Sequence, residues 1–168
     1  MLAAVNKQIQ HEQSNAHAYK AASIYFERVN FHGLEAFMAR QAHEEQMHAD
    51  KFIEHVCDRG GHVELGAISA PRTTFESPLE AAKFVRDLER STTEQIHRLY
   101  ELASKEGDYA LEVLLHWYIT EQVEEEKWSG ELLALVEQFQ EEPAQLFMLD
   151  HEWGKRGQIP SAQASRGV

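Results

Sequence analysis

Apolar residues recur every three or four positions along four long stretches of the chain, which is the period of an amphipathic α-helix. The stretches run from Leu2 to about Val29, from Leu34 to about Arg59, from Pro78 to about Glu106 and from Tyr109 to about Gln140. Each would form a helix on the order of 40 Å long. No stretch alternates with the period of two that predicts a strand. We therefore expect an all-α protein.

Turn and capping residues separate the four predicted helices. Short breaks at residues 30–33 and at Gly107-Asp108 predict antiparallel neighbours, whereas residues 60–76 form one connection long enough to run the length of a bundle. The sequence Ser77-Pro78-Leu79-Glu80 is typical of a helix start, with Ser77 as N-cap and Glu80 closing a capping box. The pattern predicts an antiparallel four-helix bundle with one long crossover between its second and third helices.

The C-terminal part is shorter and more polar. Pro143 opens a fifth helix that we expect to end at about Trp153, and residues 154–168 read as a polar tail. The length of 168 residues and the mass of 19.3 kDa suit one compact domain, which we place at residues 1–153.

Composition excludes several classes of protein. No apolar run approaches the roughly 18 residues of a membrane span, and the N-terminus turns polar too early for a signal peptide, so we expect a cytoplasmic protein without a membrane partner. The net charge of −12 disfavours nucleic acid as a partner and attracts cations instead. The single cysteine, Cys57, excludes a disulfide framework and a cysteine-rich metal module.

Each long helix carries an acidic residue on its apolar stripe, near the middle of the helix. An ionised carboxylate buried without a partner costs several kcal/mol, and no lysine or arginine lies on any of the four stripes. Oxygen ligands together with one imidazole suit iron, manganese or zinc. The pattern therefore predicts a divalent metal site, whose residues are Glu12, Glu45, His48, Glu89 and Glu125.

Two local spacings bear on this site, and each has a simpler interpretation. Glu45 and His48 form Glu-x-x-His, a weak motif that also describes a solvated helix face unless it lies opposite other carboxylates. Glu121, Glu124 and Glu125 form an acidic patch on one helix face, where mutual repulsion favours a bound cation. The alternative for Glu124 is a solvated face, although the patch favours a ligand role.

Four sequence blocks together resemble the ferritin superfamily, most closely the bacterial non-haem ferritins, over roughly residues 2–153. The blocks are Glu12 with Tyr19; Ala42-His43-Glu44-Glu45-Gln46-Met47-His48; Leu88-Glu89-Arg90; and Trp117-Tyr118-Ile119-Thr120-Glu121-Gln122-Val123-Glu124-Glu125-Glu126. The last block is the most specific of the four.

The resemblance implies a role for each of these residues. Glu45 would bridge two irons of a ferroxidase centre, and Tyr19 would assist electron transfer. Gln122 would lie close to the second iron. The other diiron ligands would be Glu12, His48, Glu89 and Glu125, and a third iron site would use Glu44, Glu121, Glu124 and Glu125.

The resemblance also implies iron storage and detoxification, with Fe(II) oxidised by dioxygen or peroxide and ferric mineral held in a shell of twenty-four subunits. No haem is expected, because haem-binding relatives carry a second Glu-x-x-His where this chain has Gln122-Val123-Glu124-Glu125, and a methionine where it has Gln46. A different diiron oxidase or peroxidase and a metal-free structural bundle stay open as alternatives. A rubredoxin-type iron site, which rubrerythrin needs, cannot form with one cysteine.

Overall fold

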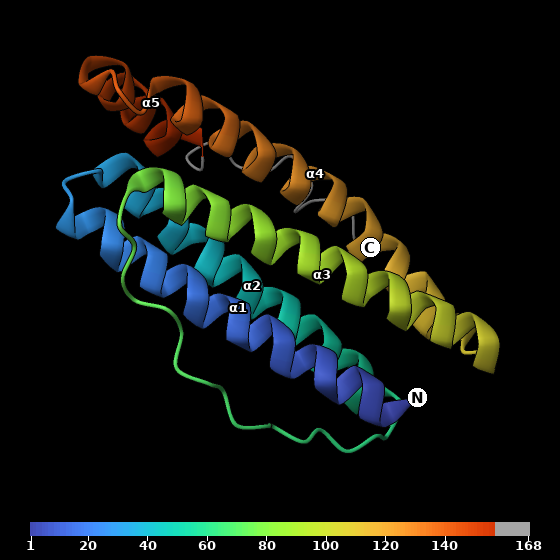
Figure 1. Ribbon diagram of the computed structural model, residues 1–168. Helices are drawn as coiled ribbons and strands as arrows, with labels where there is room; N and C mark the ends of the chain where they lie inside the picture. Colours follow the sequence, from blue (N-terminus) through green and yellow to red (C-terminus); the bar gives the residue numbers. More distant parts are fainter. Residues whose placement is uncertain (157–168) are drawn as a thin grey trace.

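The computed structural model describes residues 1–156, which contain five α-helices and no strand. Figure 1 shows four long helices side by side with a shorter fifth helix across one end. None of the helices within these residues combines the length and apolarity needed to cross a membrane. The helices are α1 (Leu2–Arg28), α2 (His32–Asp58), α3 (Pro78–Glu106), α4 (Tyr109–Phe139) and α5 (Pro143–Arg156).

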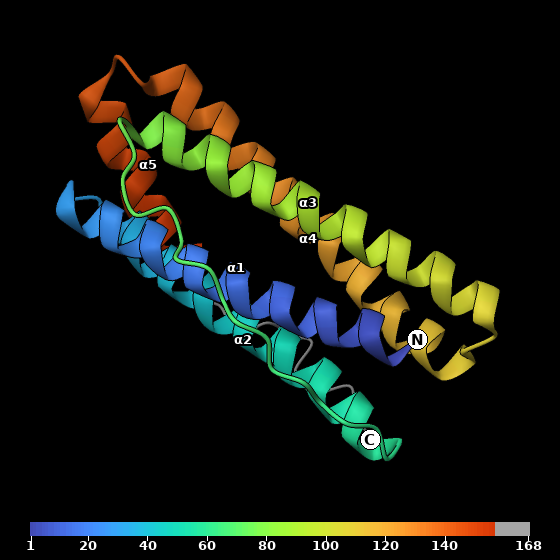
Figure 2. The same cartoon turned by 60° about the horizontal axis from the view of Figure 1, so that its bottom comes forward.

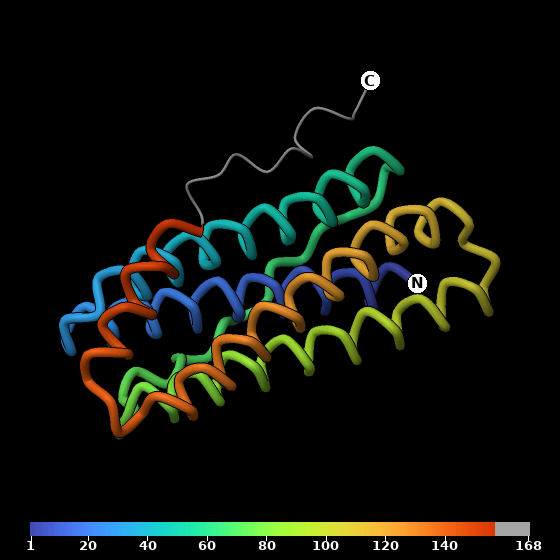
Figure 3. The backbone as a smooth tube through the Cα atoms, turned by 90° about the horizontal axis from the view of Figure 1, so that it is seen from above, coloured from blue at the N-terminus to red at the C-terminus, as the bar shows by residue number. Residues whose placement is uncertain are grey.

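The four long helices form two antiparallel pairs, α1 with α2 and α3 with α4, joined by the long crossover (Figures 1 and 2). The crossover, residues 59–77, follows the outside of α1, where the Asn6 and Gln10 side chains donate to the backbone oxygens of His62 and Ala67. The N-terminus lies at the same end as the α3–α4 turn, as Figure 3 shows. The expected antiparallel four-helix bundle with one long crossover is confirmed.

The helix ends form where the turn residues predict them. The Ser77 side chain accepts a hydrogen bond from the Glu80 amide at 3.2 Å, while the Glu80 carboxylate accepts from the Glu76 amide at 2.6 Å. The cap thus resembles the expected capping box, although Glu80 reaches one residue further back than Ser77. Gly107 ends α3 with a φ of 69°, a left-handed conformation that glycine adopts without strain, and Asp108 caps α4.

Two apolar clusters fill the bundle, one toward each end. The first surrounds Phe26, Met38 and Leu132, and the second surrounds Ile9, Phe52 and Leu115. Between them, at mid-length, each long helix contributes buried polar side chains. The core is therefore split by a polar layer, an arrangement that packing alone does not favour.

Helix α5 differs from its expected form. It continues through Gly154, Lys155 and Arg156, three residues that the sequence assigned to the polar tail. Arg156 explains the extension, because its guanidinium pairs with Glu131 of α4 and lies 4.2 Å from the centroid of the Trp153 ring. The rest of the predicted tail, residues 157–168, lies outside the described part of the chain.

A buried hydrogen bond connects helix α5 to the first turn of α2. The Asp150 carboxylate accepts a hydrogen bond from the Leu34 amide at 2.7 Å, which caps a helix whose own N-cap residue, Phe31, offers no side-chain oxygen. Gly33 permits this approach, since a Cβ there would lie 1.8 Å from the Asp150 carbonyl oxygen. This contact fixes α5 against the bundle near the first apolar cluster.

Candidate metal centre

The polar layer at mid-bundle contains the residues that the sequence predicts for the diiron site, together with Gln122. Each is at most 4% exposed, and all four long helices contribute. Carboxylate oxygens of Glu12 and Glu45 and a ring nitrogen of His48 lie within 4.8 Å of one another, close enough to hold one metal ion. The buried residues of the layer are Glu12 from α1, Glu45 and His48 from α2, Glu89 from α3, and Gln122 and Glu125 from α4.

Neutral side chains donate hydrogen bonds to three of the carboxylates, to one oxygen of Glu12 and of Glu125 and to both oxygens of Glu89. Gln8 Nε2 donates to Glu12 Oε1 at 2.7 Å, and the Tyr19 hydroxyl donates to Glu89 Oε1. Gln122 Nε2 donates to Glu89 Oε2 at 3.2 Å. Trp128 Nε1 donates to Glu125 Oε2 at 2.6 Å. These donors orient the carboxylates but do not neutralise them.

Two carboxylate oxygens in the layer lack any hydrogen bond within residues 1–156. They are Glu12 Oε2 and Glu45 Oε2, and both are fully screened from solvent. The one ion-pair contact of these buried acids in that range joins Glu45 Oε2 to His48 Nδ1 at 3.5 Å, too long for a hydrogen bond to a charged partner. Unpaired buried carboxylate oxygens are costly, and a divalent cation between them removes the cost.

Burial and mutual repulsion raise the pKa of every carboxyl group in the layer. Burial is the largest cause of the raised pKa for all four groups. The next cause is a neighbouring negative charge: that of Glu45 raises the pKa of Glu12, and that of Glu89 raises the pKa of Glu45 and of Glu125. Burial raises the pKa of Glu89 to about 7, against the hydrogen bonds from Tyr19 and Gln122, which lower it. The empty site thus binds protons that metal ions would displace.

His48 is held by the aromatic residues around it. Its ring contacts Trp117 and Tyr118 edge-on, at centroid distances of 5.4 and 5.9 Å. The Tyr118 hydroxyl donates to the His48 backbone oxygen at 2.6 Å, and Tyr118 itself stacks on Phe52. These contacts therefore fix the orientation of the imidazole at the site.

A second group lies beside the first, nearer the surface. Ligand atoms of Glu44, His48 and Glu121 lie within 4.8 Å of one another, and both acids are partly exposed. Burial, with a smaller contribution from the charge of Glu44, raises the pKa of Glu121. Gln41 connects this group to the buried layer, because its Nε2 donates to Glu44 Oε2 at 3.1 Å and lies 3.5 Å from Glu125 Oε2.

Glu89 and Glu125 are buried in the layer, but within residues 1–156 neither belongs to a set of ligand atoms that lie within 4.8 Å of one another. Glu124 also belongs to neither set, and it is the one predicted ligand whose side chain is exposed. Its place on α4 follows from helical geometry, since it lies between Glu121 and Glu125 but points away from the core. Its role in a third iron site stays a prediction.

Several polar residues of the layer were not singled out from the sequence. Gln8 and Trp128 lie four residues before Glu12 and three residues after Glu125, so helical spacing to the acids was the signal available for them. Asn15 is buried and donates to Thr92 Oγ1 at 2.9 Å, and His11 Nε2 lies 3.0 Å from the same oxygen. This network joins α1 to α3 beside the carboxylates, and no local spacing indicates it.

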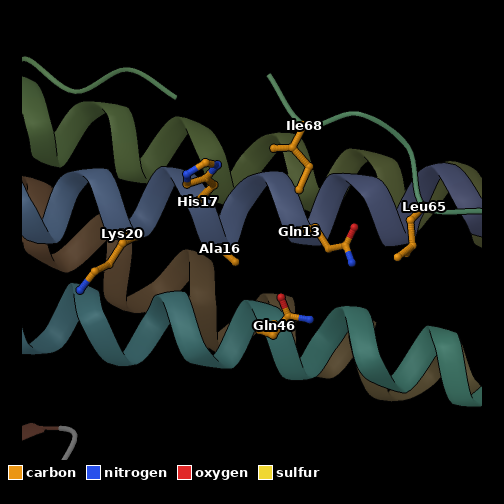
Figure 4. A pocket seen from close by; sticks show the side chains of 7 residues that line it. All are labelled: Gln13, Ala16, His17, Lys20, Gln46, Leu65 and Ile68. Carbon is orange, nitrogen blue, oxygen red and sulfur yellow. The ribbon is translucent and has the colours of Figure 1, made fainter. Parts of the chain in front are cut away.

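A shallow groove lies elsewhere, on the outer face between α1, α2 and the crossover (Figure 4). Its side chains are not metal ligands of the buried layer, and the crossover contributes two exposed apolar residues, Leu65 and Ile68. The other lining residues are Gln13, Ala16, His17, Lys20 and Gln46.

An antiparallel four-helix bundle with inward-facing carboxylates and histidine at mid-length is the architecture of the ferritin-like metal proteins. A family model described as a ferritin-like domain matches residues 2–139, and the chain belongs to this family. The usual second Glu-x-x-His of such bundles is replaced here by Gln122 and Glu125.

Relatives and solved structures agree with this assignment. The chain is 35% identical to a bacterial non-heme ferritin of Staphylococcus aureus (strain USA300), covering 93% of this chain and 94% of that protein. It is 40% identical to one of Staphylococcus haemolyticus over 75% and 76% of the two chains. An open pore ferritin of the archaeon Archaeoglobus fulgidus superposes with a TM-score of 0.90, at 36% identity and over 92% and 96% of the chains. A humanized archaeal ferritin does so with a TM-score of 0.91, at 36% identity and over 93% and 95%.

Proposed function

We propose that this protein is an iron-storage ferritin that oxidises Fe(II) to Fe(III) at the buried carboxylate layer. Membership of the ferritin-like family and 35% identity to bacterial non-heme ferritin over most of both chains support iron storage over the other two candidates, a different diiron oxidase and a metal-free bundle. The observation that carries the proposal within this chain is the pair of unpaired buried oxygens, Glu12 Oε2 and Glu45 Oε2. A structural bundle would gain nothing by keeping them.

We propose the ligand set that the resemblance to bacterial non-haem ferritins implies, and the burial of its side chains at one level of the bundle supports it. Glu45 lies between the other acids and has one oxygen free of hydrogen bonds, which suits a bridge between two ions. Glu12 and His48 would complete one iron site, and Glu89 and Glu125 the other. Gln122 would lie beside the second iron, where its Nε2 already contacts Glu89.

The reaction balances with two iron ions per turnover. Each Fe(II) gives up one electron, and the two electrons, with two protons taken from water, reduce dioxygen to hydrogen peroxide, or hydrogen peroxide to two water molecules. A carboxylate-rich set of ligands stabilises the higher charge of Fe(III), so the site favours oxidation. Tyr19 donates to Glu89 and would lie close enough to the site to exchange an electron with it.

We place a third iron site at Glu44 and Glu121, with Glu125 and Glu124 as its further ligands. Glu44 and Glu121 are partly exposed and lie next to His48, so an ion there could reach the buried layer along a short path. Gln41, which contacts both Glu44 and Glu125, would connect the two positions.

We further propose that ferric product accumulates inside a shell of twenty-four subunits. Exposed apolar residues on the outer face of the bundle support contact with other copies of the chain. Leu65 and Ile68 line the groove of Figure 4, and Ile24 follows His17 along the same stripe of α1. The cytoplasmic location expected from the sequence stays a prediction.

The experiment that tests the ferroxidase site removes its central carboxylate. Glu45→Ala should lower the initial rate of aerobic Fe(II) oxidation on the order of 100-fold, because both ions lose a ligand. Glu126→Ala is the matched control, since Glu126 is an exposed glutamate next to the site on α4. Ferric absorbance recorded in stopped flow measures the rate, and circular dichroism checks the fold. A Glu45→Ala protein that oxidises Fe(II) as fast as Glu126→Ala would refute the assignment.

A further inference from the structure

Trp128 lies one helical turn after Glu125 on α4, beside the proposed iron site. Its Nε1 donates to Glu125 Oε2 at 2.6 Å, the shortest contact that this oxygen makes. An indole N–H can only donate, so it holds a carboxylate oxygen and never competes with the carboxylate for a cation. The other donor near this oxygen, Gln41 Nε2, is 3.5 Å away and also serves Glu44.

The indole of Trp128 is locked by its neighbours. Phe37 of α2 contacts it edge-on at a centroid distance of 4.9 Å, and Tyr19 of α1 lies at 6.3 Å. Trp153 of α5 packs on the same ring at 6.1 Å and on Phe37 at 4.9 Å. Aromatic contacts from three other helices therefore set the direction of the N–H before any ion arrives.

We infer that Trp128 is a positioning residue for iron binding, whose N–H holds Glu125 Oε2 so that Oε1 is the oxygen offered to the metal ion. The inference rests on the proposed function, because it takes Glu125 as a ligand. Holding one oxygen prevents the carboxylate from turning away or from binding through both oxygens. Residues that orient a ligand in this way commonly contribute 10–100-fold to metal affinity, as an order of magnitude.

The chain offers a matched control for this N–H. Trp153 is a buried tryptophan that packs on the partly buried Trp128, but its Nε1 has no hydrogen-bond partner within residues 1–156. Trp128→Phe and Trp153→Phe each replace an indole by a smaller ring in the same aromatic cluster. Only the first substitution removes a hydrogen bond to a proposed ligand.

The test is isothermal titration of the metal-free full chain with Zn(II), and with Fe(II) under anaerobic conditions, so that binding is read without oxidation. Trp128→Phe should weaken the binding of one of the two ions by about 10–100-fold and leave the other unchanged, whereas Trp153→Phe should weaken binding much less, because its phenyl ring still packs on Trp128. Trp128→Gln, which restores a side-chain N–H without a ring, should recover part of the lost affinity.

The outcomes separate this inference from the proposed function. A wild-type chain that binds neither ion would contradict the proposed function itself. Wild-type binding with equal affinity in Trp128→Phe would overturn the positioning role alone. A loss in Trp128→Phe that Trp128→Gln does not recover would assign the effect to the lost packing of the indole rather than to its N–H, and would also overturn the positioning role.

Discussion

Glu89 is a buried carboxylate of the polar layer that titrates near neutral pH. Burial raises its pKa to about 7 from the ordinary 4.5, while Tyr19 and Gln122 donate to its two oxygens. Between pH 4.5 and about pH 7, Glu89 therefore keeps a proton in the folded chain that it has released in the unfolded chain. Stability from this group is therefore complete below pH 4.5 and is lost as the pH rises through about 7.

The sign of this linkage gives a prediction for the metal-free protein. Its melting temperature should fall by several degrees between pH 5 and pH 8 because of this group, since each kcal/mol shifts the midpoint by about 2–4 °C in a chain of this size. Glu89→Gln, which carries no titrating proton, should show a smaller fall. Scanning calorimetry at both pH values measures the difference.

Glu94→Gln is the control for that experiment, because Glu94 lies exposed on the same helix and pairs with Arg98. It should keep the pH dependence of the wild type. Zn(II) at pH 8 should restore the melting temperature of the wild type, because a bound ion replaces the lost protons. Equal pH slopes in the wild type and Glu89→Gln would contradict the account of this residue.

Residue spacing predicted which side chains lie in the polar layer but not how they are held there. Helical period places Glu12, Glu45, Glu89 and Glu125 on inward faces, and all four are buried. The donors to their oxygens depend on side-chain rotamers and on contacts between distant helices. Tyr19 reaches Glu89 across 70 residues of sequence, a contact that no local pattern encodes.

At the scale of the element, α5 caps the N-terminus of α2 and holds it in place. The Asp150 carboxylate supplies the cap that Phe31 cannot, and it brings a negative charge to the positive end of the helix dipole. The hydrogen bond is buried, so its loss would leave the Leu34 amide without a partner. The same helix carries Trp153 to the aromatic cluster around Trp128.

Asp150→Ala should therefore lower the free energy of unfolding by about 1–2 kcal/mol. Chemical denaturation followed by circular dichroism measures the change. His151→Ala, an exposed neighbour on α5, should have no measurable effect. An Asp150→Ala protein as stable as His151→Ala would mean that water replaces the cap without cost.

The helices were predicted within a few residues because their boundaries are marked locally. Pro78 and Ser77 start α3, and Gly107 ends it, as the sequence indicates. The end of α5 was missed because its last turn depends on Arg156 reaching Glu131 on another helix. Residues 154–156 are polar, and in isolation polar residues after an aromatic anchor predict a tail.

At the scale of the whole molecule, the bundle places two rigid apolar clusters on either side of one polar layer. The clusters hold the four helices in register, so that acids far apart in the sequence meet at one level. The net charge of −12 adds a surface that attracts cations toward this layer. Assembly into a shell would then separate the oxidation site from the stored product.

The most direct test of ferritin-type iron storage is gel filtration of the protein after aerobic loading with Fe(II), recording protein and ferric absorbance together. We expect ferric absorbance to elute with the protein in a particle many times the 19.3 kDa of one chain. A small protein species that carries no iron, with ferric product precipitated or eluting apart from it, would contradict storage in a shell.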